Sequence, residues 1–252
     1  MTEWFHKIEY EINGSDIQFV EIFLDPEETV IAESGTMMFM QSGIQFDTRM
    51  TDGSAKNSGF VGGLISLAKR KLTGENLFLT FYTNTSDAVR SVAFAPAYPG
   101  TIVPIDLAEM GGKILCQKRA FLCAAKGISI DVGITKKLST GFFGGDGFIL
   151  QKLSGDGLAF IHAGGTVTRR TLEDGEIMYV DTGSLVAMQP SVQFEINFVS
   201  GINSLFFGGE GMFLTRLTGP GHVWVQSMPY SRYINSIAYA IANQPAVDTK
   251  DK

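Results

Sequence analysis

Apolar and polar residues alternate along most of this chain, with the period of two that is typical of strands with one buried face. Residues 192–199 (Val-Gln-Phe-Glu-Ile-Asn-Phe-Val) are the clearest case. The same pattern predicts further strands at 29–33, 77–82, 113–117, 158–162, 176–181 and 222–226. Residues 10–17 are predicted to form a hairpin, in which Asn13 and Gly14 supply the two positive-φ positions of a tight turn.

The apolar period changes once, close to the C-terminal end. After Pro229, apolar and aromatic residues recur at helical spacing: Tyr230, Tyr233, Ile234, Ile237, Ala238 and Ile241. This spacing predicts a short amphipathic helix that ends at about Ala242.

Two blocks of sequence recur at the same interval. Residues 144–157 return as 208–221, and the apolar-polar-apolar-acidic order of 128–131 returns at 192–195, 64 positions later in both cases. Looser copies of both blocks lie upstream, at 62–74 and at 44–47. Repetition of this kind indicates one supersecondary unit used three times. We therefore predict an all-β chain of three tandem antiparallel repeats, of β-sandwich or double-stranded β-helix type, followed by the short helix. The predicted domains are 1–86, with an apolar and basic insertion, 87–164, and 165–252, with the helix and tail.

Composition supports a folded chain that associates with other copies. The 252 residues are 44% hydrophobic and 18% charged, which is typical of globular proteins. Repeats of this size bury little core alone, so they are expected to stack on one another and on other chains. The formal net charge of −6 disfavours a nucleic-acid partner, since binding to a phosphate backbone needs a basic surface.

The chain carries no recognisable targeting signal, and its cysteines suggest a reducing compartment. No run of 18 apolar residues is present, and residues 1–7 do not resemble a signal peptide. Cys116 and Cys123 are the only cysteines. They are predicted to lie in one strand-like run, where their odd spacing places them on opposite faces, which argues against a disulfide and against a metal site. We predict a cytoplasmic protein.

No set of residues has the spacing of a catalytic or metal site. The glycine-rich turns lack the Gly-Lys-Ser/Thr of a phosphate loop, and no nucleophile motif is present. The histidines lack metal-ligand spacing, and we interpret them as surface or hydrogen-bonded core residues: His6, His162 and His222. Three acids share one repeat position, which favours a solvated face or salt bridges between units over a catalytic pair: Asp47, Asp131 and Glu195. We predict no catalytic residue, no metal and no cofactor.

Residues 60–72 are the best candidate for contact with a partner. This segment joins apolar residues to three consecutive cations, a combination that favours an anionic membrane surface or a groove on another protein. The candidate contact residues are Leu64, Ile65, Leu67, Lys69, Arg70 and Lys71. The alternative is that the apolar residues pack onto the body of the protein while the cations remain in water.

Two segments of the chain resemble a known family. Residues 208–227, and residues 62–63 together with 71–79, resemble signatures of the altered-inheritance-of-mitochondria family, whose bacterial members have no known function. The resemblance covers about residues 5–240. It implies a fold similar to the tryptophan RNA-binding attenuation protein, with three β units per chain and three chains in a ring of nine units. It does not imply RNA binding, because acids stand where that protein uses lysines and arginines, and it implies no catalytic residue.

Three functions are compatible with this sequence. The leading hypothesis is a non-enzymatic, oligomeric β-ring, most simply a homotrimer, that acts as a scaffold or binding protein. The second is a small-molecule binder or hydrolase with its site between repeats, where clefts are natural ligand sites. The third is a peripheral membrane organiser that uses residues 60–72. Repeat-equivalent polar residues that converge in one pocket between units would favour the second.

Overall fold

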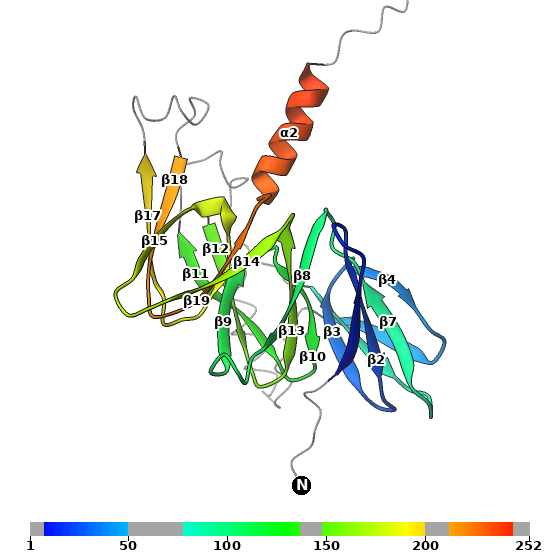
Figure 1. Cartoon of the computed structure of the whole chain (residues 1–252). Helices are drawn as coiled ribbons and strands as arrows, with labels where there is room; N and C mark the ends of the chain where they lie inside the picture. Colours follow the sequence, from blue (N-terminus) through cyan, green and yellow to red (C-terminus); the bar gives the residue numbers. More distant parts are fainter. Residues whose placement is uncertain (1–7, 50–77, 137–147, 200–211, 244–252) are drawn as a thin grey trace, which may run out of the picture.

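The computed structural model of the chain describes residues 8–49, 78–136, 148–199 and 212–243. Within these ranges almost all regular structure is β-strand, and one α-helix, α2 (Tyr230–Ala242), follows the last strand (Figure 1). The all-β class and the C-terminal helix are therefore as predicted from the sequence.

The strands fall into three successive units, each built from two antiparallel sheets. The first unit holds β1 (Glu9–Asn13), β2 (Phe19–Leu24), β3 (Thr29–Glu33), β4 (Met37–Met40), β5 (Ile44–Arg49), β6 (Leu79–Asn84) and β7 (Arg90–Phe94). The second holds β8 (Gly100–Asp106), β9 (Lys113–Gln117), β10 (Phe121–Ala125), β11 (Ser129–Lys136), β12 (Phe148–Ser154) and β13 (Leu158–Gly164). The third holds β14 (Val167–Leu172), β15 (Ile177–Asp181), β16 (Leu185–Met188), β17 (Gln193–Val199), β18 (Met212–Thr218) and β19 (Gly221–Gln226).

Each unit repeats one pairing scheme. The orders β4-β7-β2, β10-β13-β8 and β16-β19-β14 are equivalent, and so are β5-β6-β3, β11-β12-β9 and β17-β18-β15. The first unit adds β1 on the far side of β2. A shift in strand register recurs at one position of each unit, just before Phe39, Cys123 and Ala187. The repeat predicted from the sequence is thus present strand by strand in the described residues.

Neighbouring units are joined by main-chain hydrogen bonds between strands. β3 of the first unit pairs with β10 of the second, and β9 of the second pairs with β16 of the third. We call the β3–β10 contact the first junction and the β9–β16 contact the second junction. Because of these contacts, two six-stranded sheets run continuously from one unit into the next.

The buried core crosses the first junction. One cluster of buried side chains includes Ile22 and Phe94 from the first unit and Phe121 and Phe160 from the second, and it reaches Trp224 in the third. A second cluster forms around Leu150, Leu217 and Val223. Burial of large apolar side chains supplies most of the stability of such a fold, so the first two units depend on each other.

Two local predictions from the sequence are wrong. β1 and β2 do form the predicted hairpin, but residues 14–18 make a longer loop, in which Gly14 has a φ of 93° and Asn13 does not have a positive φ. Cys116 and Cys123 do not share a strand, because the turn at 118–120 separates β9 from β10. Both cysteines are buried free thiols, and they lie at different junctions.

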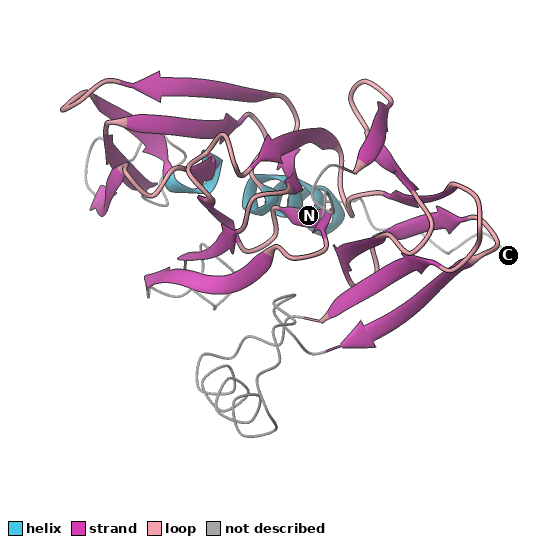
Figure 2. Cartoon of the chain, turned by 90° about the horizontal axis from the view of Figure 1, so that it is seen from below, coloured by secondary structure: helices cyan, strands magenta, loops and turns pink. Residues whose placement is uncertain are grey.

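Helix α2 projects from the body of the protein (Figure 1). Viewed from below, it lies near the middle of the chain, with sheets to either side (Figure 2). None of its residues is buried, and four large apolar side chains are exposed on it: Ile234, Ile237, Tyr239 and Ile241. No helix among the described residues is long and apolar enough to cross a membrane.

Candidate functional site

β4 and β15 each have one edge without a partner strand among the described residues, although the equivalent strands of the other units form the two junctions. β4 is equivalent to β10 and β16, and β15 is equivalent to β3 and β9, yet within the described residues β4 pairs only with β7 and β15 only with β18. They lie at opposite ends of the array (Figure 1). The chain therefore presents one half of a junction at each end.

Large apolar side chains are exposed on both of these strands. Phe39 on β4 is 39% exposed, whereas its equivalents Cys123 and Ala187 are both 0% exposed. Tyr179 on β15 is 59% exposed, whereas its equivalent Leu115 is 7% exposed. Exposed strand edges with apolar side chains favour pairing with another chain.

The second junction is closed by two glutamines. The amide of Gln226 donates to the carbonyl of Gly183 at 2.9 Å and accepts from the amide N–H of Gly164 at 2.7 Å. Gln117 Nε2 donates to the carbonyls of Thr182 and Gly183 at 3.4 and 3.3 Å. The side-chain amides of both glutamines are thus paired with the main chain.

The first junction holds a cavity of about 210 Å³ instead. Its repeat positions carry different residues: Glu33 takes the place of Gln117, and His162 takes the place of Gln226. Twelve residues line the cavity: Glu33, Ser34, Gly35, Thr36, Pro96, Ala97, Tyr98, Arg119, Phe121, Leu122, His162 and Tyr230. They come from the end of β3, the β3–β4 turn, the segment after β7, the β9–β10 turn, β10, β13 and the start of α2.

His162 is the most deeply buried ionisable group in this cavity. It is 2% exposed, and neither ring nitrogen has a hydrogen-bond partner among the described residues. Burial lowers the pKa of His162 to about 4, so the imidazole is neutral at physiological pH. Gly100 lies against this ring, because a Cβ there would come within 2.5 Å of Nε2.

Burial also shifts the pKa values of Glu33 and Tyr98. Desolvation raises the pKa of Glu33 to about 7, although Arg119 and Lys118 act in the opposite direction. Desolvation likewise raises the pKa of Tyr98 to about 12. Several residues with shifted pKa values in one cavity are characteristic of a functional site.

Aromatic rings form one wall of the cavity. Tyr98 packs edge-on against His162, with ring centroids 4.4 Å apart, and lies 5.2 Å from Tyr230. The guanidinium carbon of Arg119 lies 4.6 Å from the centroid of the Tyr230 ring, which is within the range of a cation–π contact. Arg119 is exposed and makes no hydrogen bond to another described residue, so its N–H groups are available.

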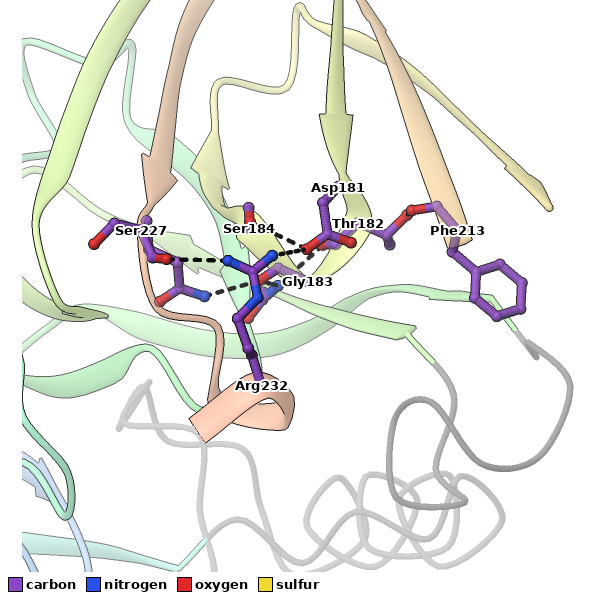
Figure 3. Close-up of polar contacts among 9 residues, drawn as sticks. Asp181, Thr182, Gly183, Ser184, Phe213, Ser227 and Arg232 are labelled. Atoms are coloured by element: carbon purple, nitrogen blue, oxygen red, sulfur yellow. Dashed lines mark hydrogen bonds and ion pairs between the residues drawn. The ribbon is translucent and has the colours of Figure 1, made fainter. Parts of the chain in front are cut away.

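Polar contacts hold the first turn of α2 beside the open edge of β15. Arg232 donates to the carboxylate of Asp181 at 3.4 Å and to the carbonyl of Ser227 at 3.3 Å (Figure 3). Ser184 Oγ also donates to Asp181, at 3.2 Å. Tyr230 in the same helical turn lines the cavity at the first junction. The start of α2 therefore contacts both this cavity and the end of β15.

The repeat-equivalent acids do not converge. Each lies beside a cation of its own unit: Asp47 Oδ2 is 2.6 Å from Arg49 Nε, Asp131 Oδ2 is 3.9 Å from Lys152 Nζ, and Glu195 Oε2 is 3.6 Å from Arg216 Nη1. All six side chains are at least one third exposed, so these pairs add little to stability. The prediction of a solvated face is correct for these acids, and the alternative of salt bridges between units is wrong within the chain.

The remaining predicted positions have separate outcomes. The proposed contact residues of segment 60–72 lie outside the described residues, and so does His6. His222 Nδ1 is hydrogen bonded to Thr171 Oγ1 at 2.9 Å, as expected for a surface histidine. His162 is in the core as expected, but its ring nitrogens have no hydrogen-bond partner in the part of the chain that the structure describes. Sequence reasoning missed Glu33, Tyr98 and Arg119, although a comparison of the repeats shows Glu33 and Gln117 at one position.

Comparison with known proteins identifies the family and the fold. The model of the family described as Mitochondrial biogenesis AIM24 matches residues 10–228. The crystal structure of protein SPYM3_0169 from Streptococcus pyogenes is similar to this chain, with a TM-score of 0.69 and 21% sequence identity over 92% of this chain and 99% of that one. No curated protein matches the chain. The match over most of its length shows that the chain belongs to the Mitochondrial biogenesis AIM24 family.

Proposed function

We propose that this protein is a self-assembling scaffold, in which β15 of one chain pairs with β4 of the next. The observation that carries this proposal is that the same contact is made twice inside the chain, at β3–β10 and β9–β16. A third junction of the same kind needs an equivalent of β9, which is β15, and an equivalent of β10, which is β4. Each chain offers one of each, at opposite ends.

The internal junctions also fix the expected register. Cys123 pairs with Ala32 at the first junction, and Ala187 pairs with Cys116 at the second. The equivalent residues on the open edges are Phe39 and Val180. We therefore expect Phe39 of one chain to lie opposite Val180 of the next, with Met40 opposite Tyr179.

Head-to-tail pairing of this kind either closes a ring or grows into a filament. A closed ring leaves neither edge exposed, which removes the usual cause of β aggregation. The family resemblance puts three chains, and hence nine units, in the ring. The proposal is thus a homotrimer.

We propose a non-enzymatic role in the cytoplasm, without nucleic acid as a partner. The two buried free thiols fit a reducing compartment. The net charge of −6 and the exposed repeat-equivalent acids oppose binding to a phosphate backbone. Contact of residues 60–72 with a membrane remains a separate prediction.

The oligomeric state of the wild-type protein tests this proposal. We expect light scattering on a sizing column to give three times the mass of the chain, unchanged on tenfold dilution in the micromolar range. A mass that equals one chain at all concentrations would contradict the proposal, and a mass that grows with concentration would replace the ring with a filament.

A further inference from the structure

We propose that the cavity at the first junction binds a small organic carboxylate, with the acid group against Arg119 and the apolar body between the aromatic rings. This site is separate from the strand edges that would join chains, so it does not depend on the ring. The inference rests on the residues of the cavity and on the contrast with the second junction.

The size of the cavity limits the ligand to a small molecule. Its volume of about 210 Å³ corresponds to roughly seven water molecules at about 30 Å³ each. This is below the range of about 300–1,000 Å³ that holds drug-sized ligands. A single ring with one acid group is therefore an appropriate probe.

The polar groups of the cavity are mainly donors. Arg119 has N–H groups without hydrogen-bond partners among the described residues, and a guanidinium binds a carboxylate through two parallel hydrogen bonds. The neutral imidazole of His162 offers one N–H, and the hydroxyl of Tyr98 offers an O–H. Burial raises the pKa of Glu33 to about 7, so its carboxyl is protonated far more often at neutral pH than that of an ordinary glutamate, and it then donates as well. A ligand rich in acceptors satisfies this set.

The apolar walls fit the rest of such a ligand. Phe121 and Leu122 are 2% and 1% exposed and line the cavity. Tyr98 and Tyr230 provide ring faces or edges. Small-molecule sites are commonly apolar with a few convergent polar groups.

The second junction shows that an unpaired polar side chain at the position of His162 is not a necessary result of the repeat. There Gln117 and Gln226 occupy the positions of Glu33 and His162 and hydrogen bond to main-chain groups across the junction, at Thr182 and Gly164. At the first junction the imidazole is buried to the same extent but is unpaired. Because an unpaired buried polar group costs stability, a ligand that pairs with it offers compensation.

The test is titration calorimetry of the full-length protein with sodium benzoate, benzamide and benzylamine. These probes share one ring and differ in charge. We expect benzoate to bind at least about tenfold more tightly than benzamide, since a hydrogen bond to a charged group is worth that much or more. Benzylamine is expected not to compete with benzoate.

Two arginine variants locate the site. Arg119→Gln is expected to weaken benzoate binding by about tenfold or more, because it removes the guanidinium. Arg170→Gln is the matched control, since Arg170 is exposed on β14 and does not line the cavity; it should bind benzoate as the wild type does.

Each other outcome overturns the proposal. If benzoate binds no more tightly than benzamide, the carboxylate charge plays no part in binding. If benzylamine binds more tightly than benzoate, the cavity is a cation site. If both arginine variants lose the same benzoate affinity, the overall charge of the protein, and not Arg119, is responsible for binding. These comparisons of ligands use only the wild type, so they hold even if Arg119→Gln fails to fold.

Discussion

The Tyr179→Asp variant is expected to be a monomer under conditions in which the wild type is a trimer. Tyr179 is 59% exposed in the single chain, but its equivalents Leu115 and Ile31 are 7% and 0% exposed at the internal junctions. Pairing with the next chain would therefore bury the aspartate opposite Arg216 on β18, whose guanidinium already contacts Glu195. Burial of a charge that is only partly neutralised is unfavourable. We expect the dissociation constant to rise by at least roughly 100-fold, measured by light scattering over a dilution series.

Phe46→Asp is the matched control for this variant. Phe46 is also aromatic, lies on the outer strand β5 and is 60% exposed, but β5 takes no part in either junction. This variant should remain a trimer. If Tyr179→Asp keeps the mass of the wild-type assembly, or if both variants dissociate into single chains equally, β15 is not the interface.

The Phe160→Ala variant is expected to lose about 3–5 kcal/mol of stability. The Phe160 side chain is 0% exposed, belongs to the cluster that joins the first two units, and packs edge-on against Tyr10 with ring centroids 4.9 Å apart. Its removal leaves a void that the surrounding strands cannot close. For a chain of this length the melting temperature should fall by roughly 10 °C, as measured by calorimetry.

The transition itself is informative as well. Because the core crosses the first junction, we expect the first two units to unfold together in both proteins. Phe46→Ala, at an exposed position, should shift the melting temperature by far less. A second, independent transition for the first unit in Phe160→Ala would contradict the shared core, and so would a melting temperature equal to that of the wild type.

Much of the fold follows from the sequence because the signals are local or periodic. The alternation at 29–33 and 113–117 predicts β3 and β9 with the bounds that the structure has. The interval of 64 residues predicts that β18 repeats β12, and the bounds of these two strands differ by that interval. By contrast, the hairpin loop at 14–18 is longer than the Asn-Gly pair suggests, since the pairing of Asn13 with Phe19 sets its length.

The junctions and the cavity depend on contacts that periodicity does not reveal. Glu33, Arg119 and His162 come from three separate parts of the chain, and nothing in their spacing brings them together. The turn at 118–120 (Lys-Arg-Ala) carries no strong turn signal, so the sequence pattern predicts a single strand that holds both cysteines. One difference between the repeats does indicate the cavity: Glu33 and His162 stand where the next unit has Gln117 and Gln226. This difference is visible only after the repeats are aligned by strand register.

Cross-linking of β4 to β15 between chains tests the central proposal most directly. Phe39→Cys and Val180→Cys in one chain should place two thiols opposite each other across the interface, since directly paired residues have Cβ atoms about 4.5–5.5 Å apart. The native cysteines should not interfere, because each lies opposite an alanine at its internal junction and so has no second thiol to pair with. Met40→Cys with Val180→Cys is the control, because Met40 follows Phe39 in the regularly paired part of β4 and neighbouring residues point to opposite faces of a strand. We predict that oxidation links Phe39→Cys/Val180→Cys into covalent dimers and trimers on a non-reducing gel and leaves the control as single chains; single chains for both, or equal linking of both, would contradict head-to-tail pairing in this register.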